Sequence, residues 1–319
     1  MKIPALKELT TGFGRNAGDW KIPFDSLRPF RPHSFRMYSF WKRFSKDRVA
    51  LFGLCVIAIV VFAALMAPVL APYDPSEQFF DGLTLEGSPL PPNERFWFGT
   101  DTNGRDQLSR LLYGARTSLL IGIVANGIAV AIGTLLGVIA GYARGFLGAA
   151  IMRFTDLMMA FPPLLLAIAL AAILKPGLSI IIVVIALVNW VQIARVIYTE
   201  TTSLAEREYI EAARALGAST PRILFRHLVP HLVPTIIVYA TLGIATTVLL
   251  EAMLSFLGRG VQPPTPAWGM MIFESQSYFL NAPWLVFIPG AAILIVALAF
   301  NLAGDGLRDA LDPTQRGRR

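Results

Sequence analysis

Few polar residues in this 319-residue chain have types and spacing that could support chemistry. His227 and His231 lie four residues apart, a spacing that places two imidazoles on one face of a helix. Pro230 lies between them, however, and no third ligand stands at metal-binding spacing. Serine-hydrolase and zinc-protease motifs are absent, and no lysine follows a glycine, so a phosphate-binding Gly-Lys-Ser/Thr signature cannot occur. We therefore predict no catalytic residue, no metal site and no cofactor bound by this chain.

A second polar set lies in the segment FGTDTNGRD, where Asp101 and Asp106 accompany Arg105. Two interpretations are open. The carboxylates could form a metal or catalytic site, or they could cap and salt-bridge the start of the helix that follows. The second is the commoner use of aspartates before an apolar run.

The elements that carry these residues must be apolar helices. The chain is 55% hydrophobic and 15% charged, whereas a soluble globular protein is nearer about 25% charged. Its apolar runs reach the length of about 20 residues that spans a bilayer as a helix. We predict an all-α polytopic membrane protein whose six spans are residues 49–71, 117–143, 154–174, 176–198, 231–257 and 284–304.

The distribution of basic residues predicts the orientation of the spans. With alternating connections, 22 of the 28 lysines and arginines lie on the side of the two termini and of residues 206–230. The positive-inside rule places that side in the cytoplasm. The net charge of +7 follows from this topology, and no soluble domain offers a basic groove for nucleic acid.

The connections between the spans differ in character. Residues 1–48 form a basic, aromatic tail suited to the lipid headgroups, although disorder is an equal alternative for residues 1–32. Outer loops are expected at 72–112 and 258–283, and a cytoplasmic tail at 305–319. The loop 72–112 is longer than a simple connection, which is typical of loops with a function.

The cytoplasmic connection 206–230 reads EREYIEAARALGASTPRILFRHLVP. Tyr209, Ala212, Ala213 and Leu216 recur at helical spacing. Gly217 then stands where a helix ends in a left-handed residue. Ser219, Thr220 and Pro221 suit the start of a second helix that continues into the span at 231–257. This pattern predicts a short, rigid helix held between two spans, as if to be moved from outside the membrane.

Within the spans, four residues could line a path. Asn189 and Gln192 are polar, although hydrogen bonding between helices is the commoner reason for such residues. Pro162 and Pro163 should kink or break the third span, and kinked spans often line cavities.

Two acidic residues and three glycines in the spans are explained without a role in a transport path. Asp156 and Glu251 lie near span ends, where we expect them to reach water. Gly133, Gly137 and Gly141, spaced by four, favour close packing inside the chain over a dimer contact.

The cytoplasmic connection resembles the loop motif of permease subunits in ATP-driven (ABC) importers: Glu-Ala-Ala, three residues, Gly, nine residues, Ile, one residue, Leu-Pro. The matching positions are Glu211, Ala212, Ala213, Gly217 and Pro230, whereas His227 and Val229 replace Ile and Leu. Five stretches of the chain resemble the second permease subunit of the dipeptide/oligopeptide/nickel class. They are RALGAST…RHLVP, APYDP, GTDTNGRD, LSFLGRGVQPPTPAWG and AFNLAGDGLRDALDP.

The resemblance implies a permease core over residues 113–308 that pairs with a homologous permease in the lipid bilayer. Two ATPase subunits would bind ATP and Mg, and a periplasmic or lipid-anchored solute-binding protein would deliver the substrate. The coupling residues would be Glu211, Ala212, Ala213, Arg214, Leu216, Gly217, Pro221 and Pro230, with Glu211 capping the helix or pairing with an arginine.

The class to which the resemblance points carries mainly peptides, and nickel or glutathione are alternative cargoes. Two hypotheses of another class remain. An autonomous channel or secondary carrier is disfavoured by the scarcity of ionisable residues in mid-span. A membrane scaffold or receptor would transport nothing.

Overall fold

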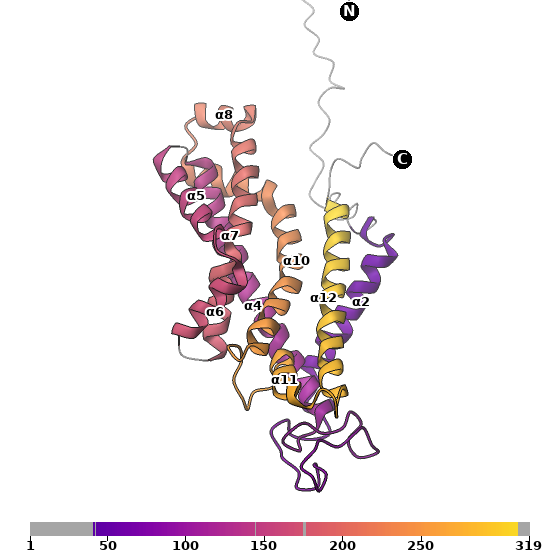
Figure 1. Cartoon of the computed structure of the whole chain (residues 1–319). Coiled ribbons are helices and arrows are strands. Elements are labelled where there is room, and N and C mark those ends of the chain that lie inside the picture. Colours follow the sequence, from indigo (N-terminus) through magenta and orange to yellow (C-terminus); the bar gives the residue numbers. More distant parts are fainter. Residues whose placement is uncertain (1–40, 42, 144, 175–176, 312–319) are drawn as a thin grey trace, which may run out of the picture. The chain divides into compact units, whose positions relative to one another are not determined.

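The computed structural model describes residues 41, 43–143, 145–174 and 177–311. Residues 1–40, 42 and 312–319 of the two predicted tails lie outside the described residues. The regular elements of the described part are all helices, and the loops between them add two isolated β-bridges (Figure 1). Its elements are α2 (Arg48–Leu65), α3 (Ala67–Leu70), α4 (Gln107–Tyr142), α5 (Phe146–Met159), α6 (Pro163–Ile173), α7 (Leu178–Ala205), α8 (Glu208–Ala215), α9 (Thr220–Ile223), the π-helix η2 (Leu224–Leu228), α10 (Val229–Phe256), α11 (Trp268–Ser275), the 3₁₀-helix η3 (Gln276–Tyr278) and α12 (Trp284–Leu311).

Five helices are long and apolar enough to cross a membrane, and a bent pair makes the sixth candidate. The five are α2, α4, α7, the continuous unit Thr220–Phe256 and α12. The bent pair is α5 and α6, whose axes differ by 89°. The break falls at Pro162, which adopts an extended conformation because it precedes Pro163. The residues predicted as the third span are therefore two helices joined by a sharp bend, and the first of them begins at Phe146 rather than at residue 154.

Side-chain caps determine where two of the long helices start. The Asp47 carboxylate accepts hydrogen bonds from the backbone N–H groups of Val49 and Ala50 at the start of α2. The Asp106 carboxylate accepts one from Ser109 N at 2.7 Å at the start of α4. Because of this cap, α4 begins at Gln107, ten residues before the apolar run that predicted a span from 117.

Close packing of α4 against α7 forms the centre of one core. Gly133, Gly137 and Gly141 are buried and face α7. A Cβ atom at Gly133 would lie 2.7 Å from the carbonyl oxygen of Trp190, and one at Gly137 would lie 2.7 Å from that of Ala194. The glycines thus let two backbones approach closely within this chain, as the spacing by four favoured.

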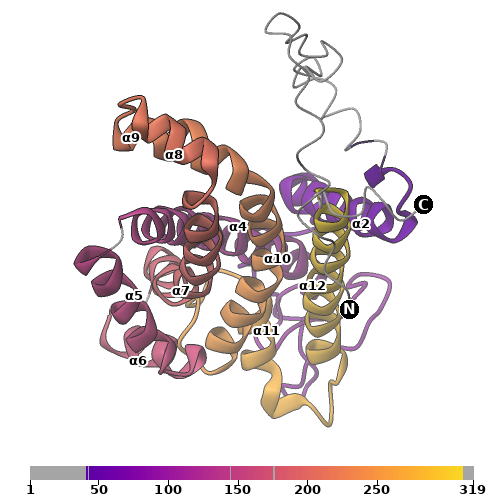
Figure 2. The ribbon, with the colours of Figure 1, turned by 90° about the horizontal axis from the view of Figure 1, so that it is seen from above.

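A second core joins α12 to α10 and α2. Seen from above, α12 lies beside α2, and α10 lies between α12 and the pair of α4 and α7 (Figure 2). Phe300, Val296 and Ile293 of α12 contribute buried side chains to this core. The helix α11 covers the outer end of α10 and α12.

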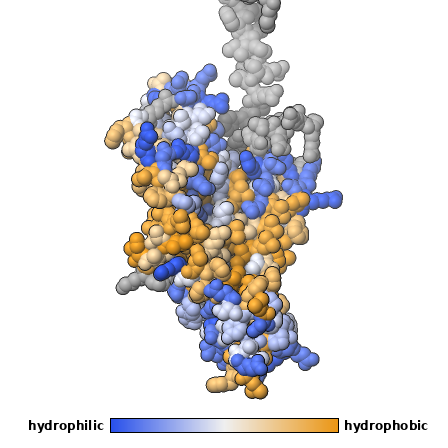
Figure 3. All heavy atoms as spheres, in the orientation of Figure 1, coloured by the Kyte–Doolittle hydropathy of each residue, from blue (hydrophilic) through white to orange (hydrophobic). Residues whose placement is uncertain are grey.

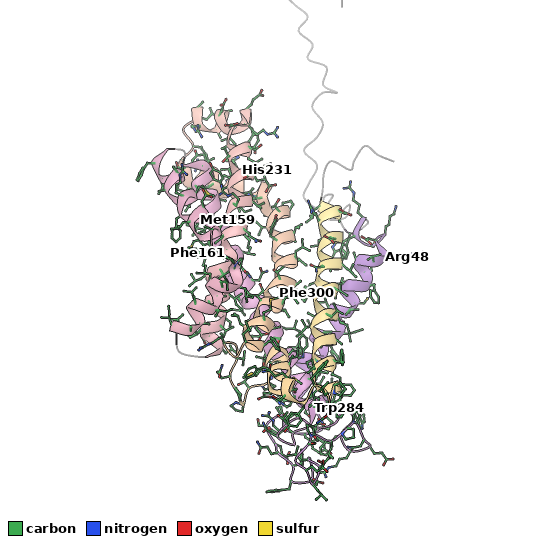
Figure 4. All side chains as sticks on the ribbon, in the orientation of Figure 1. Arg48, Met159, Phe161, His231, Trp284 and Phe300 are labelled. Atoms are coloured by element: carbon green, nitrogen blue, oxygen red, sulfur yellow. The ribbon has the colours of Figure 1, made fainter. Side chains whose placement is uncertain are left out.

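Along the direction of the long helices, the described structure is hydrophilic at both ends and hydrophobic between them (Figure 3). The start of α2, the end of α12 and α8 lie at one end. Residues 72–106 and α11 lie at the opposite end. In Figure 4, His231 lies near the first end and Trp284 near the second. The predicted cytoplasmic connection and outer loops therefore occupy opposite ends.

Candidate functional site

The helix α8 has the local chemistry of a stable short helix. Glu208 and Glu211 lie in its first turn, where carboxylates interact favourably with the helix dipole, and Arg214 lies in its last turn. Glu211 is exposed, and no ion pair joins it to an arginine among the described residues. No side chain caps the start of α8 either, so neither the predicted cap nor the predicted pairing with an arginine is present in the described part of the chain, and Glu211 contributes through its position in the first turn.

The turn after α8 is a Schellman motif centred on Gly217. Gly217 has φ 79°, the left-handed conformation that a glycine adopts at little cost. The N–H of Ala218 donates to the Ala213 carbonyl at 3.0 Å, and the N–H of Gly217 donates to the Arg214 carbonyl at 3.0 Å. These two bonds close the helix end and set the direction of the chain into α9.

The next segment is continuous with the span that follows it. Pro221 lies in the first turn of α9, and Pro230 lies in the first turn of α10. Pro230 has no N–H to donate to the Arg226 carbonyl, and the helix widens into the π-helix η2 just before it, where the Val229 N–H donates to the Leu224 carbonyl. The segments α9, η2 and α10 therefore form one continuous helical unit, Thr220–Phe256.

Buried apolar contacts fix α8 to the membrane part. Ile210 of α8 is fully buried with Ile223 and Leu228, and Tyr142 of α4 and Leu204 of α7 pack against this cluster. Sequence reasoning missed Ile210, although it is the only β-branched side chain in the helical stretch that ends at Gly217.

Two contacts of aromatic rings add to this attachment. The Arg214 guanidinium lies 5.4 Å from the centre of the Tyr142 ring, and the rings of Tyr209 and His231 stack at 5.6 Å. His231 Nδ1 also lies 2.6 Å from the His227 carbonyl oxygen, so this histidine has structural partners. α8 thus contacts α4, α7 and α10 together.

The opposite face of the connection is exposed and partly apolar. Leu216 is 89% exposed and Phe225 is 70% exposed. Glu211, Ala212 and Pro221 are exposed as well, and Ala213 is partly buried. An unpaired apolar surface beside charged side chains at an aqueous end is typical of a protein docking site.

The residues predicted to line a path do not form one group. The Asn189 amide donates to Thr247 Oγ1 at 3.0 Å and so joins α7 to α10. Gln192, also on α7, is exposed in this chain, and Pro162 and Pro163 are exposed at the α5–α6 break. Asn189 thus has the commoner role of a hydrogen bond between helices, and Gln192 is the polar residue left facing outward.

Glu251 corrects an expectation. It does not reach water; it is fully buried, and its carboxylate accepts hydrogen bonds from Ser118 Oγ at 3.2 Å and Ser255 Oγ at 2.7 Å. The two serines in turn accept from the backbone N–H groups of Trp268 and Val261. The reason is tertiary, because residues 258–275 fold back over the end of α10 and close it to solvent. Asp156, by contrast, is half-exposed and pairs with Arg195.

The polar set near the start of α4 is a salt-bridged helix start. Arg105 donates to Asp101 at 2.6 Å, and Arg110 pairs with Asp101 and with Glu274 of α11. Asp106 caps α4. No group of three histidine, cysteine, aspartate or glutamate side chains that could hold a metal ion occurs in the described part of the chain.

Comparison with known families assigns the chain to a family of transport proteins. Residues 133–317, more than half of the chain, match the binding-protein-dependent transport system inner membrane component, and residues 36–92 match the N-terminal transmembrane domain of oligopeptide transport permease C. The chain belongs to this permease family. It is a permease subunit of an ABC importer, a multi-pass protein of the inner membrane that works with ATPase subunits and a binding protein. Such subunits are not catalytic and carry no cofactor.

Individual relatives extend the similarity over most of the chain. The di/tripeptide transport system permease protein DppC of Pseudomonas aeruginosa (strain UCBPP-PA14) is 47% identical over 86% of this chain and 91% of its own length. The dipeptide transport system permease protein DppC of Alkalihalophilus pseudofirmus is 43% identical over 86% of this chain and 89% of its own. The glutathione transport system permease protein GsiD of Escherichia coli O157:H7 is 43% identical over 88% and 91%.

A solved structure shares the fold. The inward-facing MetNI methionine ABC transporter contains a chain that matches with a TM-score of 0.53 and 22% identity, covering 64% of this chain and 96% of that one. At this identity the match concerns the arrangement of helices alone.

Proposed function

We propose that this permease pairs with a homologous permease and that the two form a pathway for short peptides across the inner membrane, driven by two ATPase subunits. The relatives that are 43–47% identical are named for transport of dipeptides, di- and tripeptides, and glutathione, which is itself a tripeptide. Short peptides are the cargo common to these names, so they are the substrate class that we assign. Nickel, the alternative substrate, has no support from the names of these relatives.

The observation that carries the mechanism is the two-sided character of α8. One face, through Ile210, is buried against the ends of α4 and α7, and the other exposes Leu216. We assign the exposed residues Glu211, Ala212 and Leu216 to contact with an ATPase subunit, while Arg214 stays on Tyr142 of α4 and holds the other face in place. When the ATPase subunits close on ATP, this contact moves α8, and α9 and η2 transmit the movement to α10.

Gly217 lies between α8 and the helical unit that begins with α9, and Pro221 lies in the first turn of that unit. The Schellman turn sets the angle between α8 and α9, and Pro221 begins α9 without an unsatisfied N–H. Pro230 lies in the first turn of α10, where this helical unit enters the span. Their role in this proposal is to keep the connection stiff, so that force is transmitted and not absorbed.

Reconstitution in vesicles tests the proposal against its two rivals. The complete complex should take up a labelled dipeptide only with ATP and the loaded binding protein. An autonomous channel or carrier would transport through this chain without the ATPase subunits. A scaffold would bind the ATPase subunits without uptake at all, and either result would overturn the proposed function.

A further inference from the structure

A groove lies beside α8, at the end of the molecule that the basic residues predict to be cytoplasmic. The end of α4 and the start of α5 form one wall, and α8, α9 and η2 form the other. Its volume is about 520 Å³, within the range of about 300–1,000 Å³ that is usual for ligand sites. In Figure 1, α8 stands at the hydrophilic end and α5 lies below it. The ATPase contact proposed above does not use this groove.

One part of the groove is apolar and continues onto the outer surface of the protein. Ile139, Leu147 and Leu224 line this part. Leu147 is 55% exposed, and Phe146 beside it is 90% exposed, so the apolar lining extends onto an uncovered apolar surface of α5. In a membrane protein, apolar surface at the headgroup boundary is covered by acyl chains.

The other part of the groove carries a cation that no carboxylate of the described residues neutralises. Arg214 of α8 is exposed, and its guanidinium lies 5.4 Å from the centre of the Tyr142 ring. It forms no ion pair with another described residue, and none of the described residues that line the groove is acidic. Thr220 lines the same wall, and its hydroxyl makes no hydrogen bond to another described residue. A guanidinium and a hydroxyl are donors suited to the oxygens of a phosphate group.

The combination of a cation and an apolar wall selects the class of ligand. A soluble phosphate compound would contact Arg214 and Thr220 but would leave Leu147 uncovered. An anionic phospholipid would use both parts of the groove. Figure 3 shows that the surface changes from hydrophilic to hydrophobic below α8, as expected at the level of the lipid headgroups. The cytoplasmic leaflet carries the anionic lipids, and basic pockets between spans on that side bind their headgroups.

We propose that this groove binds one anionic phospholipid, whose phosphate accepts hydrogen bonds from Arg214 and Thr220 and whose acyl chain lies along Leu147. A lipid in this position joins α8 and α9 to the ends of α4 and α5. It therefore adds to the attachment of α8 that Ile210 provides. This consequence for the transmission of force rests on the proposed function, whereas the binding of the lipid does not.

The test measures lipid binding to the complete complex by native mass spectrometry. The complex is stripped of lipid in detergent and titrated with phosphatidylglycerol and, in parallel, with zwitterionic phosphatidylcholine. Inorganic phosphate and glycerol 3-phosphate are added as competitors, because they carry the phosphate without acyl chains. Arg214→Gln removes the cation, and Leu147→Trp fills the apolar part without altering α8. Arg222→Gln is the matched control, because Arg222 is an exposed arginine of the same connection that does not line the groove.

We expect the unmodified complex to bind phosphatidylglycerol in preference to phosphatidylcholine, and the two soluble phosphates not to displace it. A lost hydrogen bond to a charged group, or a lost apolar contact surface, corresponds to about tenfold weaker binding. One step of phosphatidylglycerol binding should therefore weaken about tenfold in Arg214→Gln and in Leu147→Trp. The same step should be unaltered in Arg222→Gln.

Equal weakening in Arg222→Gln would overturn the inference, because it would reduce the effect to the general charge of this end of the molecule. Displacement by the soluble phosphates would also overturn it and would assign the groove to a soluble phosphate compound. Unaltered binding in both groove variants, or no binding to the unmodified complex, would show that another subunit covers the groove or that it takes no lipid. No peptide, binding protein or ATP is present, so none of these results depends on whether the complex transports peptides.

Discussion

At the scale of single residues, Gly217 is the position where a substitution would act through backbone conformation alone. A Cβ atom there would meet no atom within 4 Å, so a substitution creates no clash. A left-handed backbone costs an ordinary residue about 1–2 kcal/mol, and asparagine less. We predict that Gly217→Val abolishes uptake while the protein remains in the membrane, and that Gly217→Asn retains most of it. Uptake assays with membrane immunoblots measure both, and equal activity of the two variants would refute the role of the turn.

Glu251 supports a second prediction, about stability. Its removal in Glu251→Ala leaves the buried hydroxyls of Ser118 and Ser255 without an acceptor, at about 1–3 kcal/mol for each orphaned group. Glu251→Gln keeps an acceptor oxygen and should lose less. The unfolding midpoint of the purified permease in detergent should fall by about 2–4 °C for each kcal/mol. Indistinguishable midpoints for the two variants would contradict the hydrogen-bonded role.

The two residues show what can be read locally and what cannot. The left-handed turn at Gly217 was predictable, because a glycine after a helical run is a local signal. The burial of Glu251 was not, because it depends on residues 258–275 folding back over α10. Gly260 and Gly269 of that segment contact Ser255 and Ala252 so closely that a Cβ would clash, and nothing near Glu251 in sequence announces this contact.

At the scale of elements, the seam between α4 and α7 gives a matched pair of substitutions. Gly137→Ala forces a Cβ to within 2.8 Å of Ile197 Cβ, and overpacking of this kind costs about 1–3 kcal/mol. Gly127→Ala, on the same helix, meets nothing within 4 Å and gains helix propensity of about 1 kcal/mol. Thermal unfolding should separate the two in opposite directions. A destabilised Gly127→Ala or a neutral Gly137→Ala would argue against the seam.

The broken pair of α5 and α6 shows the limit of hydropathy at this scale. Pro162 and Pro163 predicted an interruption, but not a turn of 89°. The earlier start at Phe146 was missed because Arg153 and Asp156 break the apolar run, and only the structure shows that Asp156 pairs with Arg195 of α7. Counting apolar residues located the helices and left their ends and angles to tertiary contacts.

At the scale of the whole molecule, the chain is one part of a larger assembly. Large apolar side chains remain exposed on the spans, and the exposed faces of α7 and α10 include Gln192 and Thr246. The family and the helical class could be predicted from composition and motifs. The surfaces that meet each partner could not, because they depend on which side chains the fold leaves uncovered.

The central claim is that α8 transmits force from the ATPase subunits to the spans, and Ile210→Ala tests it most directly. The measurement is uptake and ATP hydrolysis in the same proteoliposomes containing the complete complex. Losing the buried contacts of Ile210 should loosen α8 from α4 and α7 without touching its exposed face, so we predict that the ATPase subunits remain bound and that uptake per ATP hydrolysed falls about tenfold. Leu216→Ala, on the exposed face, should instead weaken ATPase binding. An unchanged ratio of uptake to hydrolysis in Ile210→Ala, with the complex intact, would contradict the account.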